Sequence, residues 1–140
     1  MESKENIEEK DIIPRISNKN TFYRFSSIDN ITLNKTRKNV VIRNDKFKIK
    51  GWAIDKHTIK PAKEVKIIID GVEYDTTYGL NRKAVSERFN SEELLKSGFV
   101  RTLHKADFSK GIHEISIKIL SSDSKEWYIK PLKQTFFTIK

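Results

Sequence analysis

Apolar and polar residues alternate along three stretches of the chain, 46–53, 65–69 and 115–119. The apolar positions are Phe47, Ile49, Gly51 and Ala53; Val65, Ile67 and Ile69; and Ile115, Ile117 and Ile119. A period of two places one face of a strand in a core and the other face outward. The second stretch runs into Asp70-Gly71, a dipeptide typical of a hairpin turn. The alternation therefore predicts three half-buried β-strands, one of them followed by a hairpin.

Shorter apolar groups between turn residues predict the remaining strands. We expect these strands at 23–33, 72–76, 99–103, 127–130 and 135–139, with Pro131 separating the last two. Only 81–96 has a helical pattern, and Ser91-Glu92-Glu93 is typical of a helix start. Short strands at close spacing favour a sandwich over an alternating α/β fold. The prediction is an all-β protein, an immunoglobulin-like β-sandwich of about seven strands with one short helical segment near 82–96.

The first twenty residues differ in composition from the rest. They contain five acids, four bases and Pro14 without apolar periodicity, which predicts a flexible charged tail or linker at 1–20. We expect 21–140 to form a single β-sandwich domain. The 140 residues include 28 Lys and Arg against 19 Asp and Glu, a net charge of +9. Residues 21–140 hold 24 of these bases and 14 of the acids, a net charge of +10, which indicates anionic partners.

Missing residue types and motifs exclude several kinds of site. The chain has no cysteine, which excludes disulfides, a thiolate nucleophile and cysteine-ligated metals. His57, His104 and His113 lie on separate segments without ligand-like spacing, and no Gly-x-Ser-x-Gly motif is present. We therefore expect no enzyme activity, no metal and no cofactor. His113 has the inward parity of its strand, which predicts a structural histidine that donates to a backbone carbonyl or a carboxylate.

The sharpest charge feature is a basic run over 35–50. It contains Lys35, Arg37, Lys38, Arg43, Lys46, Lys48 and Lys50 against a single acid, Asp45, a local charge of +6. Lys46, Lys48 and Lys50 share one strand face with Trp52. Two interpretations stay open. These four residues and Arg43 form a ligand-binding surface, or the lysines only keep a sheet surface solvated and prevent it from pairing with neighbours.

Trp52 has two interpretations of its own. In the first, it packs under the loop that contains Arg82, whose side chain bonds Asp55 or nearby carbonyls. In the second, it is an exposed aromatic platform on which a sugar ring stacks.

Short motifs follow one another between Ile28 and Leu120. They are Ile28-Asp29-Asn30-Ile31; Gly51-Trp52-Ala53 with Asp55; Val65 with Asp70-Gly71; Gly79-Leu80 with Arg82 and Val85; Phe89; Gly98-Phe99; and Gly111 with His113. In this order they resemble an immunoglobulin-like β-sandwich accessory domain found in bacterial cell-envelope and glycosyltransferase-associated proteins. One departure is Lys83-Ala84, where that family usually has Pro-Asp; the change removes a carboxylate that could cap the short helix or pair with Arg82.

The resemblance implies a non-catalytic role and a set of residues that hold the fold. This structural set is Gly51, Trp52, Asp55, Asp70, Gly71, Arg82, Gly98, Phe99 and His113. We expect an accessory, binding or spacer module of the bacterial cell envelope or surface. Its basic strand face would contact an anionic glycopolymer, such as teichoic acid, or a neighbouring domain of a longer parent protein. The alternative is a single-stranded nucleic-acid-binding β-barrel of the cytoplasm. Neither hypothesis includes a membrane span, because no run of about 18 apolar residues occurs.

Overall fold

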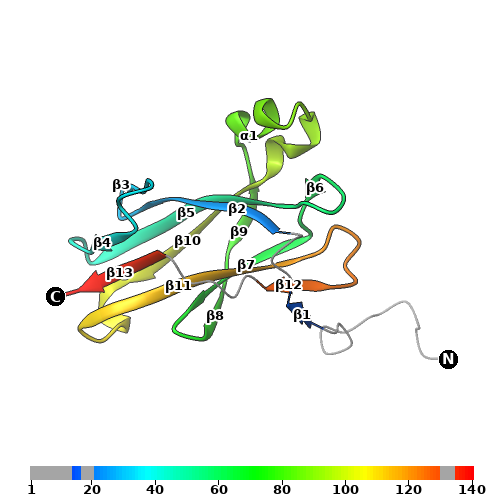
Figure 1. Cartoon of the computed structure of the whole chain (residues 1–140). Coiled ribbons are helices and arrows are strands. Elements are labelled where there is room, and N and C mark those ends of the chain that lie inside the picture. The colour runs from blue at the N-terminus through cyan, green and yellow to red at the C-terminus, as the bar shows by residue number, and fades with distance from the viewer. Residues whose placement is uncertain (1–13, 17–20, 130–134) are drawn as a thin grey trace.

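Two β-sheets lie face to face in the computed structural model of the chain, which describes residues 14–16, 21–129 and 135–140 (Figure 1). Side chains from both sheets fill the space between them. No strand of one sheet pairs with a strand of the other among the described residues, so the sheets do not close into a barrel. The predicted all-β sandwich is confirmed, whereas the barrel of the alternative hypothesis is wrong for this part of the chain.

The six-stranded sheet has the order β3-β2-β5-β10-β9, with β6 also paired to β5. Its strands are β2 (Thr21–Ile28), β3 (Ile31–Thr32), β5 (Lys46–Asp55), β6 (Lys60–Pro61), β9 (Thr77–Leu80) and β10 (Gly98–His104). β5 is the central strand, antiparallel to both β2 and β10. Its alternate positions are buried up to Gly51, and all of its residues from there on are buried.

The seven-stranded sheet has β11 at its centre. Its strands are β1 (Pro14–Ile16), β4 (Asn39–Val41), β7 (Glu64–Ile69), β8 (Val72–Asp75), β11 (Gly111–Leu120), β12 (Trp127–Ile129) and β13 (Thr135–Ile139). β7 and its hairpin partner β8 lie along one edge of β11, while β12 and β13 pair with successive parts of β11. More strands are described than the expected seven. In several places two short strands, such as β12 and β13, pair one after the other along the same edge of a longer strand.

The core between the sheets is built by the alternation seen in the sequence. Its largest fully buried side chains include Phe47, Phe99, Phe137, Ile49, Ile67 and Ile117. The rings of Phe47 and Phe137, one from each sheet, lie 5.3 Å apart between centroids. Because these residues occupy the inner positions of their strands, the outer positions remain for charged side chains.

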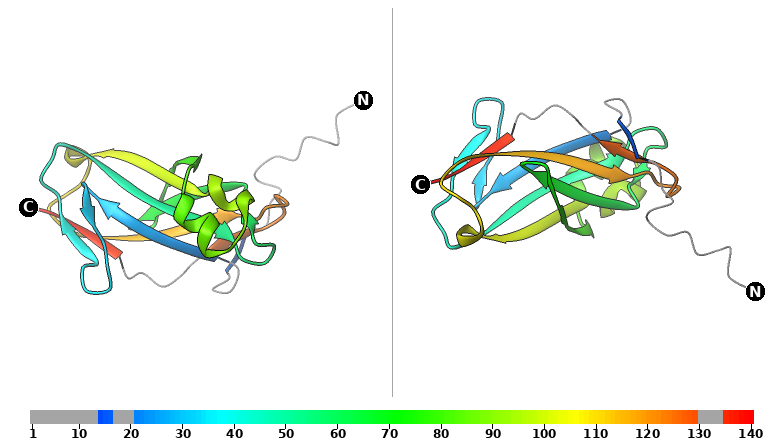
Figure 2. Two further views of the ribbon diagram at one scale, coloured as in Figure 1. Left: turned by 90° about the horizontal axis from the view of Figure 1, so that it is seen from above. Right: turned by 90° about the horizontal axis from the view of Figure 1, so that it is seen from below.

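The helical segment lies on the outer side of the six-stranded sheet, as the view from above also shows (Figure 2). It consists of α1 (Lys83–Arg88) and the 3₁₀ helix η2 (Glu92–Lys96), and a third short helix, η3 (Lys105–Asp107), follows β10. The predicted helical segment at 82–96 is confirmed. Ser91 directly precedes η2 as expected, although its side chain makes no capping hydrogen bond.

Two sequence-based expectations concern the ends of the chain. β1 lies inside the segment 1–20 that we expected to be a tail, and it pairs in parallel with β12. The other residues of that segment, like Lys130 and Pro131, lie outside the described residues. In the described part of the chain, no helix is long and apolar enough to cross a membrane.

Candidate functional site

Lys46, Lys48 and Lys50, here named the lysine row, project from the outer face of β5 and are all exposed. Because Phe47 and Ile49 between them point into the core, the strand alternation forces the three lysines outward. Their ammonium groups form no ion pair or hydrogen bond with any residue in the described part of the chain. The predicted projection of these lysines from one face is therefore confirmed.

The neighbouring strands present uncharged or weakly basic groups beside the lysine row. On β10, Val100 lies opposite Lys50, Thr102 opposite Lys48 and His104 opposite Lys46, while on β2 Ser27 lies opposite Lys50. No acid occurs at these register positions. The row is thus a positively charged ridge without a neutralising partner in the strands next to it.

Two hollows flank this ridge. The larger, of about 300 Å³, is lined by Lys48, Lys50, Gly51, Leu80, Asn81, Arg82, Gly98, Phe99 and Val100. The smaller, of about 160 Å³, is lined by Asp29, Asn30, Lys46, Phe47, Lys48 and Lys50. Lys48 and Lys50 border both, so a ligand in either hollow would meet the same two ammonium groups.

Arg82 adds a third cation to the larger hollow, beside Lys48 and Lys50. Its aliphatic stem lies over Gly98, because a Cβ placed on Gly98 would come within 2.8 Å of the Arg82 Cγ. Its guanidinium group then reaches β2, where Nη2 donates to the Ser26 hydroxyl at 2.7 Å. The acceptor is thus a serine hydroxyl and neither Asp55 nor a nearby carbonyl, the two kinds of partner that we expected.

The Asp55 carboxylate accepts hydrogen bonds from other groups, which explains why Arg82 does not bond to it. It is only 1% exposed, and its carboxylate accepts from the backbone N–H of His57 at 2.9 Å and of Ser122 at 2.9 Å. It therefore holds the turn after β5 to the loop after β11, a structural role. A sequence motif around Asp55 could not reveal Ser122 as its partner, since Ser122 is 67 residues away.

Trp52 shares the strand parity of the lysine row but is 6% exposed. Val85 and Leu94 of the helical segment pack over it, together with Phe22 and Phe89, in a second apolar cluster. The exposed-platform interpretation is wrong, and packing beneath the loop after Arg82 is confirmed. Trp52 therefore anchors the helical segment to the sheet and is not available for a ligand.

Arg43, the fifth residue of the expected binding set, does not join the lysine row. It lies in the loop between β4 and β5, and its backbone N–H donates to Asp29 at 2.8 Å. Its side chain lines a different hollow, together with Arg37 and residues of β4. The structure thus brings together Lys46, Lys48 and Lys50 and replaces Trp52 and Arg43 with Arg82.

Gly51 is required by a close approach of strands. β2 has an irregularity between Phe25 and Ser27, and there its backbone crowds β5. A Cβ placed on Gly51 would lie 2.1 Å from the carbonyl oxygen of Arg24 and 2.7 Å from the Phe99 ring. Gly51 and Phe99 therefore fit together as structural residues.

The Asp70-Gly71 turn and His113 form one structural unit. Asp70 and Gly71 have positive φ values of 50° and 85°, as the hairpin between β7 and β8 requires. Asp70 Oδ1 accepts from the Glu114 backbone N–H at 2.9 Å, and Asp70 Oδ2 lies 2.5 Å from His113 Nδ1. The other ring nitrogen, Nε2, lies 2.8 Å from the carbonyl oxygen of Ser109. The predicted buried structural histidine is confirmed.

The two sheets carry very different charges. Six Lys and Arg and one acid lie on the described strands of the six-stranded sheet: Arg24, Lys46, Lys48, Lys50, Lys60 and Arg101, with Asp55. Three bases and four acids lie on those of the seven-stranded sheet: Arg15, Lys66 and Lys118, with Glu64, Glu73, Asp75 and Glu114. The excess positive charge of the strands is thus confined to one sheet.

No group of three or more His, Cys, Asp or Glu residues in the described ranges could hold a metal ion. No family model and no curated protein matches the chain. We therefore infer function from the lysine row and its surroundings.

Proposed function

We propose that the chain is a non-catalytic binding module of a bacterial cell-envelope protein, in which the lysine row and Arg82 bind an anionic glycopolymer. The observation that carries the proposal is a row of three exposed lysines without ion-pair partners among the described residues, on the sheet that holds the excess charge. Alternate residues of a strand lie about 6.8 Å apart, so the row spans roughly 13 Å. This length suits an extended polymer with several anionic groups better than a single ion.

The geometry favours recognition of charge over stacking on sugar rings or bases. Trp52 is covered, and the large apolar residues that are exposed in the described part of the chain are Ile59, Val72, Leu80 and Ile112, none of them aromatic. Proteins that bind single-stranded nucleic acid stack bases on exposed aromatic side chains. The nucleic-acid alternative therefore lacks its main contact on this face, whereas binding to a polymer of phosphodiesters needs only the cations.

The proposal is tested by calorimetric titration with a short poly(glycerol phosphate) across a salt series. The Lys48→Gln/Lys50→Gln variant removes two charges but keeps similar side-chain size. Its matched control is Lys110→Gln/Lys125→Gln, which removes two exposed charges from loops outside the lysine row. We expect the affinity of the wild type to fall as salt rises, with a log–log slope that the first variant reduces by roughly 1.4, while the control leaves it unchanged.

Two outcomes would contradict the proposal. One is no binding at low salt. The other is an equal loss of affinity in the control variant, which would show a response to net charge alone. An oligothymidylate with the same number of phosphates is titrated in parallel. Tighter binding to it than to the polymer would favour the nucleic-acid alternative.

A further inference from the structure

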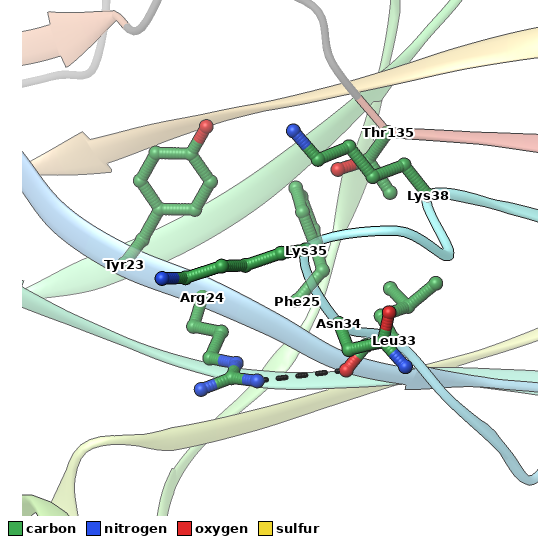
Figure 3. A pocket seen from close by; sticks show the side chains of 8 residues that line it. All are labelled: Tyr23, Arg24, Phe25, Leu33, Asn34, Lys35, Lys38 and Thr135. Atoms are coloured by element: carbon green, nitrogen blue, oxygen red, sulfur yellow. Dashed lines mark hydrogen bonds between the residues drawn. The ribbon is translucent and has the colours of Figure 1, made fainter.

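A separate hollow of about 310 Å³ lies at the edge of the sandwich, where β2, the loop between β3 and β4, and the start of β13 meet (Figure 3). It is lined by Tyr23, Arg24, Phe25, Leu33, Asn34, Lys35, Lys38 and Thr135. None of these residues lines the two hollows beside the lysine row. This hollow is therefore a separate site from the proposed polymer-binding face, and the two can be tested independently.

The loop that carries two of the cations is held in a defined conformation. Asn34 Oδ1 accepts from the backbone N–H of Thr36 at 2.8 Å and of Arg37 at 2.7 Å, and it also bonds the Thr36 hydroxyl at 2.8 Å. At one end, the Leu33 N–H donates to the Ser26 carbonyl at 2.9 Å, which ties the loop to β2. At the other end, the Phe136 N–H donates to the Lys38 carbonyl at 2.7 Å, which ties it to β13. Lys35 and Lys38 thus project from a fixed backbone, which lowers the entropy cost of binding.

Three cations border the hollow, and no acid is among its described lining residues. Arg24 Nη2 lies 3.5 Å from the Leu33 carbonyl, which holds the guanidinium group at the edge of the hollow. Lys35 and Lys38 have no ion pair with a described residue. In Figure 3, Lys35 extends between Tyr23 and Arg24, and the Lys38 ammonium group faces the space into which the Tyr23 hydroxyl points. This arrangement favours a ligand group with more than one negative charge.

The rest of the lining combines the polar residues Asn34 and Thr135 with the apolar or aromatic residues Tyr23, Phe25 and Leu33. Phe25 and Leu33 are 5% exposed and belong to the core. The Tyr23 ring packs edge-to-face on Phe25, with centroids 5.6 Å apart. Like any tyrosine with a pKa well above neutrality, Tyr23 has a protonated hydroxyl at neutral pH that can donate a hydrogen bond, and burial raises its pKa further. A ligand that fills the hollow therefore needs an anionic part and a less polar part.

We propose that this edge hollow binds a phosphomonoester carried by a single sugar. The phosphate lies among Arg24, Lys35 and Lys38 and accepts a hydrogen bond from the Tyr23 hydroxyl, and the sugar lies against Phe25 and Leu33. A dianionic phosphate matches three cations better than a carboxylate does, because it offers two charges and three acceptor oxygens. The volume is at the lower limit for small-molecule sites, which suits one sugar and excludes a larger ligand.

The test is a titration of ¹⁵N-labelled protein with glucose 6-phosphate, followed by amide chemical shifts and by calorimetry. Glucose and inorganic phosphate are the matched probes for the two halves of the ligand. We expect the shifts to be confined to amides at Tyr23, Leu33–Lys38 and Thr135. Glucose 6-phosphate should bind at least about tenfold more tightly than either probe alone, since both halves contribute contacts.

Variants separate this site from the lysine row. Lys35→Gln/Lys38→Gln should weaken binding of glucose 6-phosphate by at least about tenfold, because charge-assisted contacts are lost. Lys35→Arg/Lys38→Arg, which keeps both charges, should restore most of it, and Lys48→Gln/Lys50→Gln should leave it unchanged. The four lysines that these variants change are all exposed, so an unchanged amide spectrum serves as the check on folding.

Several results would overturn the proposal. They are shifts distributed outside the hollow, binding of glucose or inorganic phosphate as tight as that of the ester, and equal weakening by the Lys48/Lys50 variant. Failure of this experiment would not affect the polymer-binding proposal, which depends on other residues.

Discussion

The Tyr78 hydroxyl joins two segments of the six-stranded sheet that are distant from its own strand, β9. It donates to the Ala53 carbonyl on β5 at 2.7 Å and accepts from the Ala62 N–H at 3.0 Å. The Tyr78→Phe substitution keeps the ring and removes both bonds. Each bond contributes about 1 kcal/mol, and the N–H of the buried residue Ala62 loses its acceptor, so the free energy of unfolding should fall by about 2–3 kcal/mol near pH 8.

The loss should depend on pH with a defined sign. Burial raises the pKa of Tyr78 to about 12, whereas an unfolded tyrosine titrates near its ordinary value of 10. Between these values the unfolded state releases a proton that the folded state keeps. The stabilisation by Tyr78 is therefore complete below about pH 10 and declines as the pH rises, by about 1.4 kcal/mol per unit. At about pH 11 the wild type should exceed Tyr78→Phe by only about 1 kcal/mol.

Urea unfolding followed by circular dichroism at about pH 8, 10 and 11 measures this difference. Other groups that titrate in this range, including Tyr23 and Tyr128, are present in both proteins, so their effects cancel when the two are compared. A difference in unfolding free energy that stays constant or grows with pH would contradict the raised pKa of Tyr78. It would show that the phenol is not kept neutral by its surroundings.

Three further substitutions test structural assignments by the same urea unfolding. Gly51→Ala should cost about 2–3 kcal/mol or more, because its Cβ would lie 2.1 Å from the Arg24 carbonyl oxygen; a neutral result would contradict the close approach of β2 and β5. Asp55→Ala should cost about 2–4 kcal/mol, since two backbone N–H groups lose a charged acceptor, and Asp55→Asn, which keeps one carbonyl oxygen, should cost less. Leu94→Ala should cost about 2–5 kcal/mol and increase acrylamide quenching of Trp52 fluorescence, because Leu94 is fully buried in the cluster over that ring.

The long strands were predictable because each alternates over five or more residues against one core. β5, β7 and β11 all lie where the period of two placed them. The short strand β6 was not predictable, since two residues carry no periodicity, and β3 lies inside the stretch 23–33 that we expected as one strand. They form only because a long neighbour offers its backbone for pairing, which is a tertiary effect.

Strand parity predicts on which face of a sheet each residue of the candidate site lies, and only this part of the site was predictable. Parity placed the lysine row and Trp52 on one face, but it could not show that Leu94, far along the chain, covers the Trp52 ring. Arg82 joined the site for a similar reason, because its partner Ser26 lies 56 residues away. The edge hollow was missed altogether. The basic run pointed to Lys35 and Lys38, yet nothing local connects them with Tyr23.

Lysines on the outer face of the other sheet show what a lysine with a purely structural role looks like in this fold. Lys118 Nζ lies 2.7 Å from Glu73 Oε2, and Lys66 lies within 4 Å of Glu64, Glu73 and Asp75. Both ammonium groups also lie over the Trp127 ring, at 4.5 and 5.3 Å from its centroid, and both side chains are only 11–12% exposed.

The lysine row has none of these features. Its lysines are exposed and have no acidic partner among the described residues, and the field of such surface charges extends about 10 Å into solution at 0.1 M salt. The fold thus neutralises lysines on one sheet and leaves them available on the other. A surface that only had to remain solvated would not require this difference, because a surface with charges of both signs interspersed also stays in solution. The asymmetry therefore favours a binding role for the six-stranded sheet, and the salt series with the Lys48→Gln/Lys50→Gln variant tests it directly.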